Sequence, residues 1–357
     1  MQKITPVAIA TVFSGCFLGA GFLSGQEILQ FFGVFGGYGL AGMVLSIAAF
    51  VFFSLLVLRI ARRTGRLEFD HIIVPKDIPW LRNLVGGFFL FFLFDVMVAM
   101  IAGAGALLQQ VLGVPAAVGA AIMSLLTLVL ALAGAAGMMV VFNIVVPLLL
   151  AASICIGVFA FFTLPAAPIE ARPFVAGNPL LGNWFFSALS FISYNMIGSV
   201  SILVPLAVDA EDEKTIHRGL GLGAVMLALI FAFILLPMIL YGPLVGQADL
   251  PMLELAWRVS GVAGVVYAVL LFFGMFTASL SSLFAVTTRI QLRVPSLSLK
   301  KFVPFLCVLA FLCSLLGFKN MVAVVYPICG YVGFLALAGI LIHYVALKKQ
   351  EALPLDR

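Results

Sequence analysis

The sequence predicts an all-α integral membrane protein with ten transmembrane helices, arranged as two five-helix repeats of opposite orientation. Three observations predict this fold class. Hydrophobic residues make up 64% of the 357-residue chain and charged residues only 9%, whereas a soluble domain carries about a quarter charged residues. Apolar runs of about 20 residues, long enough to cross a bilayer, recur along the chain. Basic residues gather in alternate connections between these runs.

Hydropathy defines ten apolar spans of about 20 residues or more. They cover residues 5–30, 37–59, 83–111, 115–134, 138–164, 181–207, 218–243, 259–287, 301–317 and 321–346. With the N-terminus inside, sixteen of the 19 Lys and Arg residues fall on the cytoplasmic side, and only Arg172, Arg258 and Lys319 fall outside. This asymmetry follows the positive-inside rule and predicts that both termini are cytoplasmic. The basic residues then anchor the topology, so we expect no nucleic-acid partner.

The chain divides at an outer loop rich in proline and glycine, PAAPIEARPFVAGNPLLG. The predicted organisation is a first five-helix repeat over 1–164, an outer linker over 165–180, a second five-helix repeat over 181–346 and a cytoplasmic tail over 347–357. Because five is odd, the second repeat enters the membrane from the opposite side to the first. This is the arrangement of inverted-topology repeats.

Span one is interrupted by the glycine-rich polar stretch GAGFLSGQE, Gly19–Glu27. Glycine costs a helix about 1 kcal/mol relative to alanine, and a break exposed to lipid would leave peptide groups unsatisfied. The stretch therefore predicts a break that faces protein, a cavity or a ligand. Amides that begin the second half-helix would be available to a carboxylate, and carbonyls that end the first to a cation. The alternative is that the glycines only let helices pack closely.

Two carboxylates lie inside apolar spans. Asp95 lies near the middle of span three, where an ionisable group is expensive and indicates a functional site by default. We expect it to bind a substrate amine or to carry a proton, the alternative being a structural hydrogen bond to a broken helix. Glu27 follows the first break by one to two turns. It is a candidate substrate ligand, proton carrier or gate residue, the alternative being a cap on the half-helix.

A second interruption, SYNMIGS, is predicted in span six at Ser193–Ser199, and we expect Tyr194, Asn195 and Gly198 to line the same site. The acidic stretch Asp209–Arg218 is interpreted as a solvated loop that caps span seven, not as a metal site. ADLPMLELAWRVSG, before span eight, predicts a short amphipathic outer helix.

These features resemble a known family. Ten spans as five plus five, with breaks in spans one and six, resemble the LeuT fold of the amino acid–polyamine–organocation superfamily. GAGFLSGQE, the later SYN and the run LVPLA look like the YkvI-like group of bacterial membrane proteins. The resemblance covers nearly the whole chain in layout, but in motifs only spans one, six and eight. It implies a bacterial inner-membrane protein and a substrate site formed by Gly19, Ala20, Gly21, Phe22, Asp95, Tyr194, Asn195 and Gly198.

The resemblance further implies one sodium ion between spans one and eight. Span eight contains FTASLSSLF, which matches the spacing Ala-x-x-Ser-Ser of sodium-coupled members. The implied ligands are the carbonyls of Gly15, Leu18 and Ala278 and the hydroxyls of Ser281 and Ser282. Five oxygens suit a hard cation; the alternative is that the serines bond to carbonyls of their own helix. Phe22 stands where some members place the asparagine of a second sodium site, so no second ion is expected.

The sequence thus predicts a secondary active transporter of an amino acid or a related small carboxylate or amine solute, driven by inward sodium flow through alternating access. Two alternatives stay open: a proton-coupled transporter or exchanger that uses Asp95 or Glu27, and a ligand-sensing receptor that binds without transporting. An enzyme is not expected, because no phosphate-binding loop, metal-ligand set or nucleophile elbow occurs. The expected partners are a small solute and the lipid bilayer; the sequence leaves the oligomeric state open.

Overall fold

The computed structural model describes residues 4–75, 78–133, 138–165, 178–210 and 212–352. Span one forms three short helices, α1 (Pro6–Phe17), α2 (Ala20–Leu23) and α3 (Gln26–Phe31). The hydroxyl of Thr5 caps α1 by accepting the amide of Ala8 at 3.2 Å, and Pro6 is tolerated at the first helical position because its missing N–H would have no partner there. The predicted interruption of span one is therefore confirmed.

Eight helices among the described residues are long and apolar enough to cross a membrane. Seven of them are α4 (Gly37–Thr64), α6 (Pro79–Leu112), α7 (Ala116–Ala133), α8 (Met138–Thr163), α9 (Trp184–Asp209), α10 (Glu213–Leu240) and α13 (Gly261–Arg293). The eighth spans Phe318–Gln350; it joins α15 (Phe318–Asn320), the π-helical turn η3 (Met321–Val325) and α16 (Tyr326–Ala352). Spans one and nine are occupied by α1–α3 and by α14 (Leu299–Ser314), which are shorter. The all-helical membrane fold is confirmed, and the count of ten helices stays a prediction.

Short helices connect the long ones. They are η1 (Gly33–Phe35), α5 (Phe69–Ile73), η2 (Pro179–Leu181), α11 (Gly242–Val245) and α12 (Pro251–Val259). The helix α12 lies where the amphipathic segment before span eight predicted one. The carboxylate of Asp212 accepts the amide of Thr215 at 2.7 Å, and this hydrogen bond lowers the pKa of Asp212. The acidic loop therefore caps α10 as expected.

The predicted break in span six is wrong, because α9 runs without interruption from Trp184 to Asp209. The polar side chains bond to the preceding turn of their own helix: Asn195 donates to the carbonyl of Phe191 at 3.0 Å, and Ser199 donates to that of Met196 at 3.2 Å. A single glycine, Gly198, costs the helix only about 1 kcal/mol. Span six lacks the closely spaced glycines that break span one.

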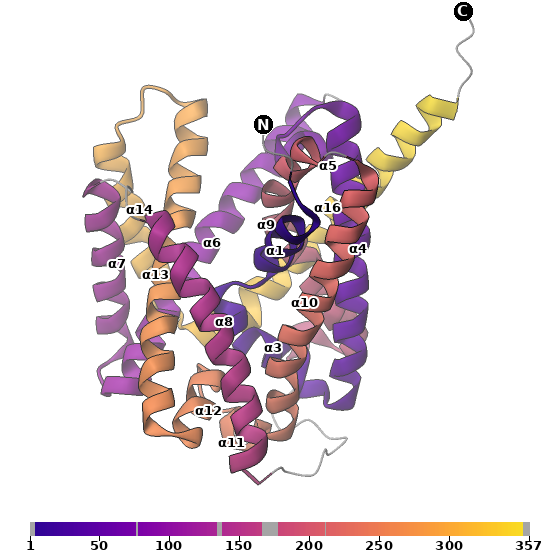
Figure 1. The fold of residues 1–357 in the computed structure, drawn as a ribbon. Coiled ribbons are helices and arrows are strands. Elements are labelled where there is room, and N and C mark those ends of the chain that lie inside the picture. The colour runs from indigo at the N-terminus through magenta and orange to yellow at the C-terminus, as the bar shows by residue number, and fades with distance from the viewer. Residues whose placement is uncertain (1–3, 76–77, 134–137, 166–177, 211, 353–357) are drawn as a thin grey trace, which may run out of the picture.

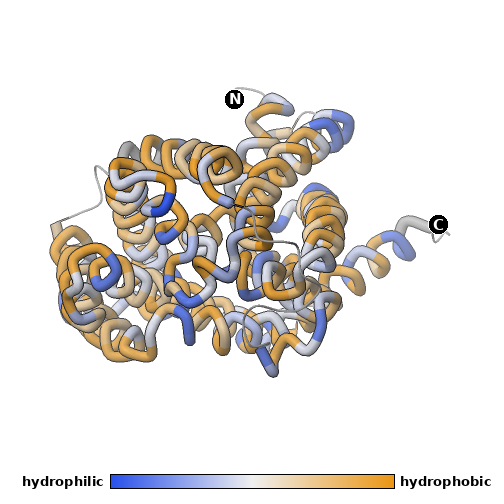
Figure 2. Tube along the Cα trace, turned by 90° about the horizontal axis from the view of Figure 1, so that it is seen from below, coloured by the Kyte–Doolittle hydropathy of each residue, from blue (hydrophilic) through white to orange (hydrophobic). Residues whose placement is uncertain are grey.

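The helices form a bundle in which α1 lies between two groups of long helices (Figure 1). The close packing expected of glycines occurs in α10, where a Cβ on Gly219 would lie 2.6 Å from the Cβ of Ile9 in α1. The core beside α2 and α3 is aromatic: the ring centroid of Phe231 lies 5.2 Å from that of Phe22 and 5.0 Å from that of Phe32. Apolar residues dominate the long helices all around the bundle (Figure 2).

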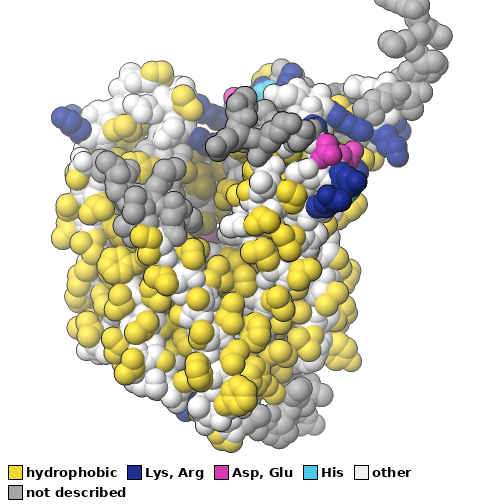
Figure 3. Space-filling view, in the orientation of Figure 1, with side chains coloured by type: hydrophobic (Ala, Val, Ile, Leu, Met, Phe, Trp, Pro, Cys, Tyr) yellow, Lys and Arg dark blue, Asp and Glu magenta, His cyan; other side chains and the backbone are white. Residues whose placement is uncertain are grey.

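Charged side chains gather at one end of the molecule. In the view of Figure 3, Lys and Arg lie mainly at the end where α1 begins and α16 finishes, and apolar side chains cover most of the visible surface below it. The helix α12 lies at the opposite end (Figure 1). We refer to these two ends as the basic end and the α12 end. This segregation of charge is the arrangement that the positive-inside rule anticipates.

Candidate functional site

The broken first span has two interruptions, and neighbouring helices satisfy the groups that the second one frees. The carbonyl of Leu23 accepts the hydroxyl of Tyr267 in α13. The carbonyl of Ser24 accepts the amide of Met252 in α12 at 2.9 Å. Gly25 has φ of 84°, a left-handed conformation that favours glycine. The second break is thus stabilised inside the protein, as a break at membrane depth requires.

The first break, at Leu18–Gly19, has a different environment. Gly15 and Gly19 are exposed, and a Cβ added to either would meet no atom within 4 Å. These two glycines therefore border open space and do not mediate helix packing. Ala20 begins α2 close to α13, since its Cβ lies 3.7 Å from the position that a Cβ on Gly274 would occupy. The break thus approaches the helix that carries the predicted sodium ligands.

Gly21, Glu27 and Tyr194 meet in one buried cluster. A Cβ on Gly21 would lie only 2.0 Å from Oε1 of Glu27, so the carboxylate occupies the space that a side chain would need. The other oxygen, Oε2, accepts the hydroxyl of Tyr194 from α9. The ring of Tyr326 in α16 lies 5.1 Å from that of Tyr194, centroid to centroid. Three segments that are distant in sequence therefore meet around Glu27 and Tyr194.

Asp95 belongs to the same region. Its residue surface is 3% exposed, and its Oδ2 has no hydrogen-bond partner among the described residues. Tyr326 lies within electrostatic reach of both Asp95 and Glu27. The expected structural hydrogen bond to the broken helix is thus not made by Oδ2 in the described part of the chain. A buried oxygen without a hydrogen-bond partner is energetically unfavourable. A ligand or a proton could supply the missing partner.

The remaining predicted substrate residues lie around this cluster in different environments. Gly198 faces Phe92 of α6, whose ring would lie 3.2 Å from an added Cβ. The amide of Asn195 is used by its own helix, as described above. The ring of Phe22 is buried in the aromatic core, where it packs on Phe191 and Phe231. The structure therefore brings Gly21, Glu27 and Tyr194 into direct contact and leaves Phe22 as a packing residue.

The predicted sodium ligands divide between α1 and α13. The carbonyl of Gly15 accepts the amide of Leu18 at 3.2 Å, and the hydroxyl of Ser281 donates to the carbonyl of Thr277 at 2.7 Å. Ser282 is 7% exposed and makes no hydrogen bond to another described residue. A donor hydroxyl keeps its oxygen lone pairs, so both serines retain an acceptor for a cation.

Sequence reasoning missed three polar groups of this region. Tyr326 and Tyr267 come from spans ten and eight, and a tyrosine in an apolar span usually has a hydrogen-bond partner, which was a usable signal. Gln26, beside Glu27, is fully buried, and neither its Oε1 nor its Nε2 has a partner in the described part of the chain. It belongs to the GAGFLSGQE stretch, but nothing in its spacing distinguished it from a helix cap.

A cleft of about 390 Å³ opens at the basic end between α5, α6 and the end of α13. Its lining includes Asp70, Arg82 and Arg289. Nε of Arg82 lies 2.9 Å from Oδ2 of Asp70, which fixes α5 to α6. Leu90 of α6 also lines the cleft. The cleft is thus lined by charged groups of both signs at the basic end.

The helices and the buried polar cluster together define a class: an all-helical, multi-pass membrane protein with a LeuT-type fold. No family model matches the chain. It is 28% identical over 343 residues to the uncharacterized membrane protein YkvI of Bacillus subtilis (strain 168), covering 96% of this chain and 97% of YkvI. It is 24% identical over 339 residues to YyaD of the same organism, covering 94% and 95% of the two chains.

The fold resembles that of a solved structure, the inward-facing conformation of Mhp1. The TM-score is 0.68 at 15% identity, and the match covers 95% of this chain and 76% of that chain. The LeuT-type fold and the resemblance to the YkvI-like proteins are therefore confirmed.

Proposed function

We propose that this protein is a secondary active transporter of a small solute, an amino acid or a related carboxylate or amine, coupled to sodium by alternating access. One observation carries the proposal. A helix broken twice inside the bundle carries one buried carboxylate, Glu27, and packs against α6, which carries a second, Asp95. Membrane transporters commonly form their sites from such discontinuous helices near mid-membrane.

Two features support alternating access, with the inner side open. Gly15 in α1 and Gly19 at the first break border open space, and a cleft opens at the basic end between α5, α6 and the end of α13. At the α12 end, the amide of Met252 bonds to the carbonyl freed at Ser24, so α12 covers the broken helix. An inward-open transporter needs access to its site from the cytoplasmic side and a closed outer side. The opening at the basic end and the contact of α12 with the broken helix fit this requirement.

The sodium part of the proposal rests on Ser281 and Ser282 in α13 and on the approach of α2 to that helix. A proton-coupled mechanism is the second candidate, and a specific observation favours it: neither Glu27 nor Asp95 forms an ion pair with a described basic residue. A carboxylate without a basic partner can have its charge compensated by a proton, which is what proton coupling requires. The receptor alternative shares the site but predicts no flux.

The test is solute binding and flux measured with purified protein in liposomes. An amino-acid and amine panel is screened by thermal shift in sodium or potassium, and the best ligand is followed for uptake under an inward sodium gradient, an inward proton gradient or none. Sodium-driven accumulation supports the proposal. Accumulation driven only by protons supports the second candidate, and binding without accumulation supports a receptor.

Ser282→Ala tests the ion site directly. Losing one of about five ligands should weaken apparent sodium affinity about tenfold, equivalent to about 1.4 kcal/mol, and solute affinity should fall only through coupling. Ser279→Ala is the control, because that hydroxyl lies 3.4 Å from Thr127 of α7 and is not a predicted ligand. An unchanged sodium response in Ser282→Ala would remove this site from the proposal.

A further inference from the structure

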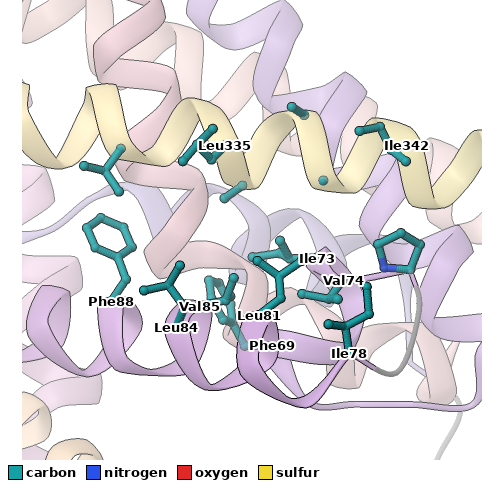
Figure 4. A pocket seen from close by; sticks show the side chains of 15 residues that line it. Phe69, Ile73, Val74, Ile78, Leu81, Leu84, Val85, Phe88, Leu335 and Ile342 are labelled. Atoms are coloured by element: carbon teal, nitrogen blue, oxygen red, sulfur yellow. The ribbon is translucent and has the colours of Figure 1, made fainter.

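An apolar groove of about 430 Å³ lies between α5 and α6 on one side and α16 on the other (Figure 4). Its floor is buried: Phe69, Ile73 and Val74 are 1%, 3% and 4% exposed. Its rim is open, since Leu84 on α6 is 61% exposed and Leu335 on α16 is 74% exposed. This volume is in the range of roughly 300–1,000 Å³ that ligand sites occupy.

The groove is bordered by helices that can cross a membrane. Both of its long walls, α6 and α16, belong to helices that are long and apolar enough to cross a membrane. Water is a poor occupant of the groove, because apolar walls offer it no hydrogen bonds. An acyl chain fills the space with no loss of polar contacts.

Hydrogen bonding and close packing hold the groove's shape. Nδ1 of His343 in α16 lies 2.8 Å from the carbonyl of Ile72 in α5. A Cβ on Gly339 would lie 2.6 Å from the carbonyl of Ile73, so α16 crosses α5 at backbone distance. The floor of the groove is therefore built by a fixed crossing of α5 with α16.

A second depression continues along α16 toward the basic end. It is lined by Leu341, Ile342, Val345, Ala346 and Lys349, and Ile342 also lines the groove. The apolar path therefore ends at an exposed ammonium group. An apolar path that ends at one positive charge is complementary to a molecule with a hydrocarbon chain and a negative headgroup.

We propose that the groove binds one acyl chain of an anionic phospholipid, with the phosphate of the headgroup at Lys349. The lipid occupies the space between the α5–α6 connection and α16. It thus adds contacts across the same crossing that His343 and Gly339 form. This site is separate from the Glu27–Asp95 region and does not depend on the transport proposal.

The experiment measures the unfolding temperature of the full chain in detergent with added lipid. Long-chain phosphatidylglycerol should raise it by about 2–4 °C, phosphatidylcholine should raise it less, and dihexanoyl phosphatidylglycerol should not. Ala336→Phe fills the groove and should abolish the long-chain response. Ala151→Phe places the same side chain on an exposed position of α8 and should keep that response.

Lys349→Gln should make the responses to phosphatidylglycerol and phosphatidylcholine equal. A full long-chain response in Ala336→Phe would overturn the groove as the binding site. If that variant does not fold, the wild-type comparison decides: equal responses to long and short chains overturn the proposal. A retained preference for phosphatidylglycerol in Lys349→Gln overturns the headgroup assignment.

Discussion

At the scale of single residues, the carboxylate of Glu27 lies at the centre of the site. It rests against Gly21, accepts the hydroxyl of Tyr194 and lies within electrostatic reach of Tyr326. No described basic side chain bonds to it. A cation or proton that compensates the carboxylate must therefore come from solution. Because such a ligand binds only the folded protein, it should also stabilise the site.

Gly21→Ala should weaken solute binding at least about tenfold, because the added Cβ would displace the Glu27 carboxylate from Tyr194. Moving a flexible side chain costs little, so the unfolding temperature should change by only a few degrees. The matched control is Gly37→Ala, at the start of α4, where the added Cβ meets open space. Isothermal titration of both variants decides; equal affinities would show that the position of Glu27 does not matter for binding.

Asp95→Asn should lower uptake at least about tenfold while leaving the protein as stable as the wild type or more so. The change keeps the shape but replaces the titratable carboxyl by a neutral amide, so the unfavourable burial of an unpaired charge can no longer arise at this position. Uptake against pH and an unfolding curve measure the two effects. Asp249→Asn, at the half-buried start of the α12 segment, is the control. Wild-type uptake with a wild-type pH profile would return Asp95 to a structural role.

At the scale of elements, the two apparently similar interruptions behaved differently. Span one breaks because Gly19, Gly21 and Gly25 fall within seven residues, and because α12 and α13 supply partners for the carbonyls of Ser24 and Leu23. Those partners lie more than 200 residues away, so the sequence indicated the break but not what satisfies it. Span six has the polar residues without the repeated glycines, and its side chains bond within the helix.

Gly25→Ala should destabilise the protein by about 1–3 kcal/mol, since it combines a left-handed backbone with a clash. The added Cβ would lie 2.7 Å from Cγ of Met252 in α12. Gly65→Ala is the matched control, because Gly65 also has positive φ, 65°, but an added Cβ there meets nothing within 4 Å. Chemical unfolding of both variants separates backbone strain from the α12 contact. If both variants lose the same free energy of unfolding, α12 moves away from the added Cβ at no measurable cost.

At the scale of the whole molecule, composition and charge placement were sufficient to predict the all-helical membrane fold. The predicted site was less complete. Spacing pointed to Gly21, Glu27, Tyr194 and Asp95, but it could not show that Tyr326 joins them, since contacts between spans one, six and ten depend on three-dimensional packing. The predicted Arg172 position on the outer side lies outside the described residues.

The orientation in the membrane is testable by cysteine labelling in a variant that lacks the five native cysteines. Positions next to Arg63, Lys214 and Lys300 should react only with reagent on the cytoplasmic side, because the basic end should face the cytoplasm. Positions next to Arg258 and Lys319 should react only from outside. Labelling of any of these from the wrong side would contradict the predicted topology, with its inverted repeats.

The hydrogen bond from the amide of Met252 to the carbonyl of Ser24 provides a way to measure how often the α12 end opens. The amide of Met252 is protected from exchange with deuterium only while its bond to the broken helix persists. Opening the α12 end must break that bond, so the exchange rate of this one amide reports how often the site is released to the outside. A solute that closes the outer side should slow the exchange, and one that opens it should accelerate it, without any label on the solute.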